Sequence, residues 1–274
     1  MNSPIKTHGG KHYLAKEIVK LAKQARYTHY AEPFFGGGSV LFEFQHNGIS
    51  ETVNDLNKNL TNFWECIRHK ETFEQFYDQI NSTPFSELEF DKAKNLLNYE
   101  GSDPKFVIVK RALAFFTVNK QSRQGIGKSY ATPTTRTRRG MNEHVSAWLT
   151  SIEGLPEIHN RLKTVEIRNM DFRDFIKKYD HTKCLFYLDP PYLHSTRTAT
   201  NVYEFEMQEK DHVDLLGLIS SLRGSFILSG YQSNLYDTYA RKNGWKKNVY
   251  DIDNKASSDK TKEIKQECVW YNFR

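Results

Sequence analysis

A glycine-rich turn lies between a predicted strand and a predicted helix near the start of the chain, and this pattern constrains the fold more than any other feature. Residues 28–34 are predicted as a strand, Gly36-Gly37-Gly38-Ser39 as a tight turn, and residues 40–44 as a helix. Residues 51–54 are predicted as a second strand, which Asp55 follows. A strand, a turn, a helix and another strand in this order are typical of an α/β sheet.

The glycine turn has two interpretations. Glycines between a strand and a helix let backbone N–H groups approach a ligand closely, and Asp55 after the next strand can accept hydrogen bonds from ribose hydroxyls. The spacing does not match G-x-G-x-x-G, so the turn gives no direct indication of a dinucleotide fold. A nucleoside-type ligand and a plain tight turn with a helix N-cap therefore stay as alternatives.

Strands and helices alternate again toward the C-terminus. Residues 171–179 and 209–222 show the apolar spacing of helices, and Gly224 is expected to end the second one. Strands are predicted at residues 164–168, 184–188, 226–229, 246–252 and 267–273. Alternation at both ends of the chain predicts an α/β open sheet with helices on both faces.

The middle of the chain interrupts this alternation. Residues 56–113 are mostly helical in pattern, residues 145–152 form a short helix, and Leu155-Pro156 is interpreted as a turn. We therefore predict a sheet domain of residues 1–55 plus 161–274, and an inserted, mainly helical domain of residues 56–160.

Positive charge is concentrated in a basic loop, residues 119–140. The loop has six basic and no acidic residues, and since the whole chain carries +6, the remainder sums to zero. Its glycines and proline exclude a long regular helix. A basic segment with hydroxyl side chains suits a phosphate backbone, whereas the plainer alternative is a solvated loop; the local excess of charge favours nucleic acid. The basic residues are Lys120, Arg123, Lys128, Arg136, Arg138 and Arg139.

Composition excludes several other classes of protein. Mean hydropathy is −0.70 and no apolar run reaches the roughly 18 residues of a membrane helix. The first residues lack the apolar block of a secretory signal, and three cysteines far apart exclude a disulfide scaffold. Cys66 and His69 have C-x-x-H spacing but no further ligands, so no metal is expected. We expect a soluble cytoplasmic protein.

A second motif, Asp189-Pro190-Pro191-Tyr192, directly follows the predicted buried strand 184–188. Two prolines fix the backbone and remove two N–H donors, which leaves carbonyl groups free to accept hydrogen bonds. Ligands of open α/β sheets bind beyond the carboxyl ends of strands, where this motif falls. A carboxylate, a carbonyl and the flat ring of Tyr192 suit a planar base with an exocyclic amine.

Together the two motifs carry a family resemblance. Phe34-x-Gly36-x-Gly38, followed much later by Asp189-Pro190-Pro191-Tyr192, resembles the amino-methylating DNA methyltransferases that use S-adenosylmethionine. The order of glycine loop, helical insertion and D-P-P-Y is similar to that of the Dam-like, D12-class adenine-N6 enzymes. The resemblance implies a Rossmann-like methyltransferase sheet as the catalytic domain, and a target-recognition domain in the insertion.

The same resemblance implies roles for individual residues. Lys6 to Lys11 resembles the family's K-x-x-G-G-K segment, which places Thr7 and Lys11 on the cofactor. Asn54 to Asn57 resembles its D-x-N segment, with Asp55 on the ribose, and Asp171-Phe172 resembles the pair that holds the adenine of the cofactor. The residues expected to bind S-adenosylmethionine are Thr7, Lys11, Glu32, Phe34, Gly36, Gly38, Asp55, Asp171, Phe172 and Asp189.

The resemblance also implies a mechanism. The catalytic residues are Asp189, Pro190, Pro191 and Tyr192, and the substrate is an adenine flipped out of double-stranded DNA. The methyl group moves to the amine in one in-line displacement, without a covalent enzyme intermediate. Two alternatives stay open: methylation of cytosine N4 or of an RNA adenine, and a DNA-binding relative that has lost catalysis.

The expected setting follows from the same family. We expect a bacterial or phage-encoded enzyme that acts as a monomer or weak dimer, with a cognate restriction endonuclease as a possible partner.

Overall fold

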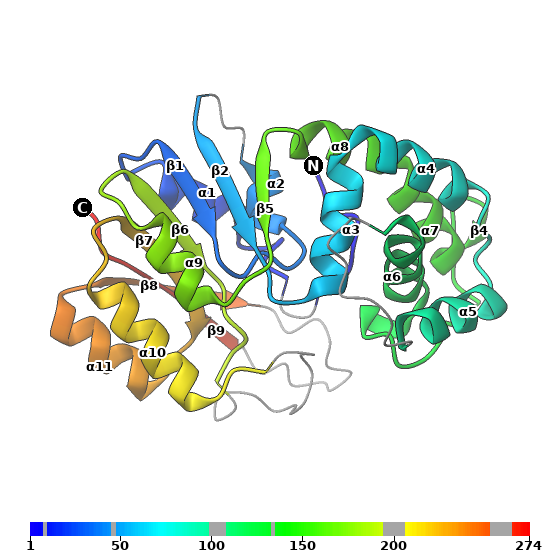
Figure 1. Ribbon diagram of the computed structural model, residues 1–274. Coiled ribbons are helices and arrows are strands. Elements are labelled where there is room, and N and C mark those ends of the chain that lie inside the picture. Colours follow the sequence, from blue (N-terminus) through cyan, green and yellow to red (C-terminus); the bar gives the residue numbers. More distant parts are fainter. Residues whose placement is uncertain (8–9, 45–47, 99–107, 133–134, 194–205, 253–264) are drawn as a thin grey trace. The chain divides into compact units, whose positions relative to one another are not determined.

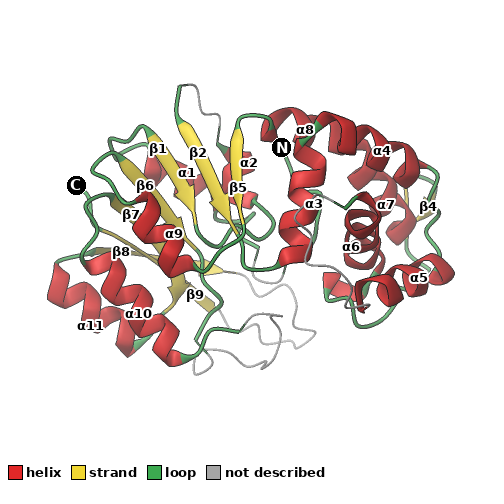
Figure 2. Cartoon of the chain, viewed as in Figure 1, coloured by secondary structure: helices red, strands yellow, loops and turns green. Residues whose placement is uncertain are grey.

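The computed structural model describes residues 1–7, 10–44, 48–98, 108–132, 135–193, 206–252 and 265–274 (Figures 1 and 2). The chain forms two compact units. The first consists of Met1–Lys16, Gly36–Gln45 and Asn57–Asn169, and the second of Glu17–Phe35, His46–Leu56 and Met170–Arg274. The first unit thus takes up two N-terminal segments in addition to the helical middle of the chain.

The second unit is built on a mostly parallel sheet. Its strands follow the order β2-β1-β6-β7-β9-β8, in which β1 pairs in parallel with β2 and β6, and β6 with β7. The last strands pair antiparallel, β7 with β9 and β9 with β8. The strands are β1 (His29–Glu32), β2 (Ser50–Asn54), β6 (Cys184–Leu188), β7 (Ser225–Tyr231), β8 (Lys246–Ile252) and β9 (Lys265–Tyr271).

Helices bury this sheet. Every residue of β6 is buried, as expected for a central parallel strand that is covered on both faces. One face packs against α9 (Phe172–Tyr179), α10 (Glu209–Ser220) and α11 (Asn234–Asn243), whose apolar side chains share one core with β6, β7 and β9. In Figure 1, α9 and α10 lie in front of the sheet and α1 (Ala15–Ala22) lies behind it.

The first unit is mainly helical. Its helices are α2 (Ser39–Glu43), α3 (Lys58–Arg68), α4 (Lys70–Asn81), α5 (Glu87–Asn98), α6 (Val109–Gln121), η1 (Arg123–Gly125), α7 (Glu143–Glu153) and α8 (Leu155–Leu162). Its strands are β3 (Thr137–Arg138) and β4 (Met141–Asn142), which form a hairpin, and β5 (Val165–Arg168). Aromatic rings hold the helices together: Phe63 of α3 stacks on Phe116 of α6 with ring centroids 5.6 Å apart.

The predicted α/β class is confirmed, and two local interpretations were wrong. Leu155-Pro156 is not a turn but the start of α8, because proline is compatible with the first turn of a helix. Gly224 does not end α10, which stops at Ser220. Instead, a Cβ atom at Gly224 would lie 2.6 Å from the carbonyl oxygen of Cys184, so close backbone packing requires this glycine.

Within the described part of the chain, no helix is long and apolar enough to cross a membrane.

Candidate functional site

Polar side chains gather where the parallel strands of the second unit end. Glu32 is the last residue of β1, Asp189 directly follows β6, and Tyr231 ends β7. Glu267 of β9 pairs with Tyr231 in the sheet register. This carboxyl edge is where open α/β sheets bind their ligands, and Asp189 lies there because it directly follows β6.

Tyr192 of the D-P-P-Y motif is held in place by two residues of this edge. Its hydroxyl donates a hydrogen bond to Glu267 Oε1. Its ring packs edge-on against Tyr231, with centroids 4.4 Å apart and planes at 62°. Glu267 is fully buried and Tyr192 is only 6% exposed. A buried carboxylate is costly unless it accepts hydrogen bonds, so Glu267 is matched to the tyrosine hydroxyl.

Burial and three carboxylates of this edge raise the pKa of one tyrosine, Tyr187 of β6. Burial raises the pKa of Tyr187 well above its usual range, and the negative charges of Asp189, Glu32 and Glu267 raise it further. The Tyr187 hydroxyl lies 3.2 Å from Ser229 Oγ. Tyr187 therefore stays a neutral phenol among carboxylates, able to act as a hydrogen-bond donor.

A second buried tyrosine accompanies Glu32. The hydroxyl of Tyr30 donates to Glu32 Oε1 at 2.7 Å, and Glu32 itself is 1% exposed. Burial raises the pKa of Tyr30 well above its usual range, and the Glu32 charge adds to the effect. Glu32, predicted as a cofactor residue, thus lies in a pre-organised buried pair at the end of β1.

Asn54, the last residue of β2, forms hydrogen bonds with the loop that follows β1 and with the loop that precedes α9. Its side-chain amide donates to the carbonyl oxygens of Pro33 and Met170, both at 3.0 Å, and its Oδ1 accepts from the Met170 N–H at 3.0 Å. Its own carbonyl accepts from the Phe35 N–H at 2.8 Å. Asn54 is 1% exposed. It therefore fixes the backbone next to three predicted cofactor residues. These are Phe34, Asp171 and Asp55, of which Asp55 is half-buried directly after β2.

The Asp171-Phe172 pair begins α9. Asp171 caps the helix by accepting from the Arg173 N–H at 2.8 Å, and the Phe172 ring contacts Phe34 with centroids 5.4 Å apart. The Arg173 guanidinium lies 4.4 Å from the centre of the Phe172 ring and forms ion pairs with Asp171, and with Asp211 and Asp214 of α10. The structure thus brings Phe34, Asp171 and Phe172, three of the predicted cofactor residues, close together.

The glycine turn and the N-terminal segment meet within the first unit. Gly36 and Gly38 have φ angles of 51° and 69°, in the region that favours glycine. A Cβ atom at Gly37 would lie 2.9 Å from Thr7 Oγ1, and one at Gly10 would lie equally close to the same atom. The structure therefore packs Thr7 directly against the turn.

Lys11, the other predicted cofactor residue of the N-terminal segment, is buried, with 3% of its surface exposed. Its carbonyl accepts from the N–H groups of Leu14 and Ala15 at the start of α1. Residues 8 and 9 of the same segment lie outside the described part of the chain.

Most of the predicted DNA-binding residues lie on the surface of the first unit. Arg123, Lys128, Arg136 and Arg138 are exposed. Arg139 is exposed as well, but its guanidinium pairs with the carboxylate of Glu153 at 3.1 Å, so its charge is partly neutralised.

Lys120 differs from the other basic residues because it is half-buried near the end of α6. Burial, together with the charge of Lys6, lowers the pKa of Lys120 to about 8. Lys6 Nζ donates to the carbonyl oxygens of Lys120 and Ser122 at 3.1 and 3.3 Å. The side chain of Asn119 holds the backbone of Lys6 at both its N–H and its carbonyl. Two cations therefore lie together where α6 meets the N-terminal segment.

Several site residues were missed by the sequence analysis. Glu267 and Tyr231 belong to strands with no motif of their own, so only the register of β7 and β9 reveals them. Arg173 follows the D-F pair and could have been noted as a cation next to an acid, but its partners Asp211 and Asp214 lie about 40 residues further along the chain.

The chain is similar in sequence to a known family and to a protein named as a methyltransferase. Residues 8–258 match the family model of D12 class N6 adenine-specific DNA methyltransferases. The Type II methyltransferase M.MjaIII of Methanocaldococcus jannaschii is 24% identical over 226 residues, which cover 77% of this chain and 76% of that protein.

Sequence identity to solved structures is low. Precorrin 8W decarboxylase from Methanobacterium thermoautotrophicum has a TM-score of 0.44 at 9% identity, with coverage of 100% of this chain and 96% of that one. The SAM dependent methyltransferase from Agrobacterium tumefaciens has a TM-score of 0.29 at 14% identity, covering 69% and 62%. The family match spans nearly the whole chain. The chain therefore belongs to the D12 class of N6 adenine-specific DNA methyltransferases, which makes it a DNA methyltransferase with S-adenosylmethionine as its cofactor.

Proposed function

We propose that this enzyme methylates the N6 amine of an adenine flipped out of double-stranded DNA, at a specific sequence. The observation that carries the proposal is the position of Asp189-Pro190-Pro191-Tyr192 at the carboxyl end of the fully buried strand β6, with Tyr192 fixed by Glu267 and Tyr231. A carboxylate, proline carbonyls and an oriented aromatic ring suit an adenine better than a base without an exocyclic amine.

The residues present fit S-adenosylmethionine. In the second unit, Phe34 and Phe172 offer apolar rings for the adenine moiety, Asp171 and Asp55 offer carboxylates for its amine and for the ribose, and Glu32 lies at the end of β1. In the first unit, the glycines of the turn, Gly36 and Gly38, let the backbone approach a ligand closely, beside Thr7, while Lys11 offers a cation for a carboxylate. When bound, the cofactor supplies an electrophilic methyl group.

Asp189 and the Pro190 carbonyl have the task of making an aromatic amine nucleophilic. The lone pair of such an amine is delocalised into the ring. Hydrogen bonds from both amine protons to Asp189 and to the Pro190 carbonyl favour a tetrahedral nitrogen, whose lone pair then points away from the ring. Positioning and electrostatics supply most of the rate. Asp189 need not be a strong base, since the proton can leave after the nitrogen has gained its positive charge.

Tyr192 is proposed to stack on the flipped base. A base inside a duplex cannot reach a carboxylate at the edge of the sheet, so it must leave the helical stack. Stacking on an aromatic side chain contributes about 1–3 kcal/mol per base. The hydrogen bond from Tyr192 to Glu267 and the ring contact with Tyr231 keep the ring in one orientation and reduce the entropy lost when the base binds.

The basic residues of the first unit are proposed to bind the DNA backbone. Exposed Arg and Lys side chains neutralise phosphates, and arginine is also the commonest reader of guanine in the major groove. The set consists of Lys120, Arg123, Lys128, Arg136, Arg138 and Arg139. One flipped base needs one site, so we propose that the enzyme acts as a monomer. The type II name of its archaeal relative supports a restriction endonuclease as its cellular partner.

Nucleoside analysis of the product tests the proposal. The purified protein is incubated with labelled S-adenosylmethionine and either unmethylated duplex DNA or RNA, and the products are digested to nucleosides. We expect labelled N6-methyl-2′-deoxyadenosine from the DNA and no labelled nucleoside from the RNA. N4-methylcytosine or label confined to RNA would overturn the assigned substrate, and DNA binding without any methyl transfer would identify a relative that has lost catalysis.

A further inference from the structure

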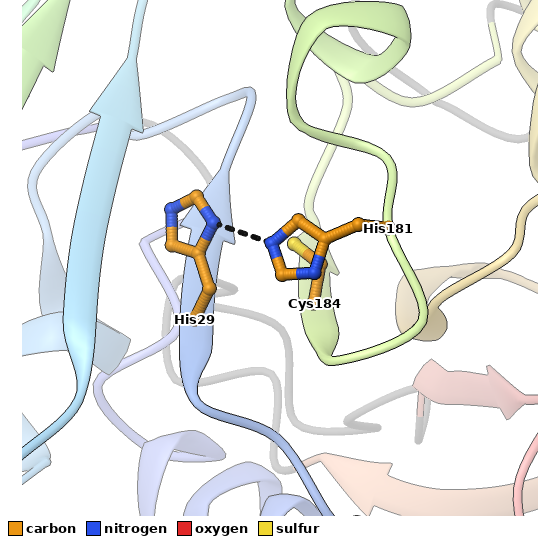
Figure 3. Close-up of side chains that lie close together, drawn as sticks. All are labelled: His29, His181 and Cys184. Carbon is orange, nitrogen blue, oxygen red and sulfur yellow. Dashed lines mark hydrogen bonds between the residues drawn. The ribbon is translucent and has the colours of Figure 1, made fainter.

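Three metal-ligating side chains meet at the amino edge of the sheet in the second unit. His29 is the first residue of β1 and Cys184 the first of β6, and the two are direct partners in the parallel register. His181 lies in the turn that precedes β6. One donor atom from each residue lies within 4.8 Å of the others (Figure 3). Asp189 is at the other end of β6, roughly 15 Å away by the rise of a strand.

The turn that carries His181 and Cys184 is tightly fixed. The Cys184 N–H donates to the carbonyl of His181 at 2.9 Å, and the N–H groups of Thr28 and His29 donate to the carbonyl of Lys183 at 3.0 and 3.2 Å. Gly224 packs against the carbonyls of His181 and Cys184 so closely that no Cβ atom fits. Backbone contacts of this kind hold the donors in position before any ligand arrives.

Hydrogen bonds define the tautomers of both imidazoles. The Lys183 N–H donates to His181 Nδ1 at 3.2 Å, which leaves the proton of a neutral His181 on Nε2. His181 Nε2 lies 3.2 Å from His29 Nδ1, the contact drawn in Figure 3, and His29 Nε2 lies 2.9 Å from Thr52 Oγ1. His29 therefore directs an unprotonated Nδ1 toward His181 and donates its other N–H to Thr52.

This is the arrangement of a metal ligand and its supporting residue. A ligating histidine usually donates its second ring N–H to a neighbouring acceptor, as His29 does to Thr52. Two nitrogens bound to one tetrahedral Zn²⁺ at about 2.0–2.1 Å are about 3.3 Å apart, close to the separation of the two imidazoles. The sulfur of Cys184 supplies a third donor of the kind that Zn²⁺ prefers to Mg²⁺ or Ca²⁺.

We propose that His29, His181 and Cys184 form a binding site for Zn²⁺ or a cation of similar chemistry. Both histidines are half-buried, so a cation can reach them from solvent, whereas Cys184 is buried behind them. Three protein ligands leave one position of a tetrahedron for water. The site ties β1, β6 and the intervening turn together, so its effect is on stability, and it is independent of the methyl-transfer chemistry.

Occupation requires two changes in the protonation of the ligands. The thiol proton of Cys184 leaves to solvent, and the proton of His181 moves from Nε2 to Nδ1. The hydrogen bond from the Lys183 N–H to His181 Nδ1, which is long at 3.2 Å, is then broken. The cost of that bond lowers the affinity of the site relative to a structural zinc site with four protein ligands.

Cobalt titration tests the proposal on the full-length protein after chelator treatment. Co²⁺ bound by a thiolate gives a sulfur-to-metal charge-transfer band, and tetrahedral Co²⁺ gives visible bands that Zn²⁺ abolishes. We expect both signals at one equivalent, and a rise in Tm of about 5 °C with saturating Zn²⁺. The Cys184→Ser variant, which changes one atom, is expected to lose the charge-transfer band, and His181→Ala to weaken binding at least tenfold.

Matched controls separate this site from the other thiols. Cys66→Ser and Cys268→Ser replace buried free cysteines elsewhere, and both variants are expected to keep the signals. Binding of S-adenosylmethionine to each variant shows that it is folded. Absence of the charge-transfer band in the wild-type protein, or an unchanged band in Cys184→Ser, overturns the proposal.

Discussion

At the scale of single residues, the most informative feature is a buried carboxylate that supports the D-P-P-Y motif. Glu267 is 0% exposed and accepts a hydrogen bond from Tyr192, yet it lies 75 residues beyond it in the sequence. Sequence patterns identify D-P-P-Y because its residues are contiguous. They cannot identify Glu267, since its proximity depends on β9 returning antiparallel to β7.

Tyr192 and Glu267 are expected to act as a unit. Tyr192→Phe keeps the ring but leaves Glu267 with one hydrogen bond fewer, and Glu267→Gln removes the charge but keeps a carbonyl acceptor for the tyrosine. We expect each variant to lower kcat about three- to thirtyfold, and the double variant to cost clearly less than the product of the two. Steady-state kinetics measure the three variants. Independent, multiplicative effects on kcat would contradict the coupling, while an unchanged Kd for S-adenosylmethionine serves as the control.

The depressed pKa of Lys120 predicts how DNA affinity depends on pH. Burial and the Lys6 charge lower the pKa of Lys120 to about 8, so in the free protein the ammonium loses its proton as the pH rises through that value. If Lys120 binds a phosphate, affinity falls between pH 7 and pH 9. Lys120→Arg stays charged over this range, so the variant is expected to show a flatter profile. Fluorescence anisotropy at constant salt measures the DNA affinity at each pH. The same pH dependence in wild type and Lys120→Arg would show that Lys120 does not bind DNA.

At the scale of elements, strands and helices with strong periodicity were predicted correctly, whereas connections were not. The buried strand β6 and helix α9 are close to their predicted bounds because their apolar spacing is unambiguous. Helix α8 was not predicted because Pro156 was interpreted as a turn residue. Helix α11 was not predicted because its sequence is mostly polar and only Tyr236 and Ala240 are buried. Local rules judge such segments by composition, but the packing of the whole unit decides their structure.

Asn54 is predicted to be essential for the loops at the carboxyl edge. Asn54→Ala leaves the carbonyls of Pro33 and Met170 and the N–H of Met170 without their side-chain partner, at about 1–3 kcal/mol for each group left unsatisfied. We expect a loss of several degrees in Tm and weaker binding of S-adenosylmethionine. Asn81→Ala, which removes an exposed side-chain bond in α4, is the control and should change neither. Thermal melts and calorimetry measure the two effects, and full cofactor affinity in Asn54→Ala would contradict the assignment.

The arginines at the β3–β4 hairpin are predicted to contribute unequally to DNA binding. Removing a cation that neutralises a phosphate reduces the slope of log affinity against log salt by about 1. Arg136→Ala and Arg138→Ala should each show such a reduction. Arg139→Ala should show less, because Glu153 already pairs with that guanidinium. Salt titrations of duplex binding measure the slopes, and a larger effect for Arg139→Ala than for the other two would show that DNA displaces Glu153.

At the scale of the whole molecule, the residues proposed for catalysis and the concentrated positive charge belong to different parts of the chain. The D-P-P-Y motif and its supporting residues lie in the second unit, and the basic loop with a net charge of +6 lies in the first. The order of motifs in the sequence was enough to predict the family and the α/β class, because short contiguous motifs carry the chemistry. It was not enough to predict the roles of Asn54 and Glu267 or the amino-edge cluster of His29, His181 and Cys184. Their partners are far apart in the sequence and meet only in the folded sheet and its loops.

The central claim is that Asp189 directs methyl transfer to adenine N6 at a defined DNA sequence, and a single-base map tests it most directly. Unmethylated genomic DNA is treated with S-adenosylmethionine and either the wild-type enzyme or Asp189→Ala, and N6-methyladenine is mapped along it. The account predicts methylation at one short recurring sequence with wild type, and a loss of about 100-fold or more with a variant that still binds DNA and cofactor. Full methylation by Asp189→Ala, or methylation of a different base, would contradict it.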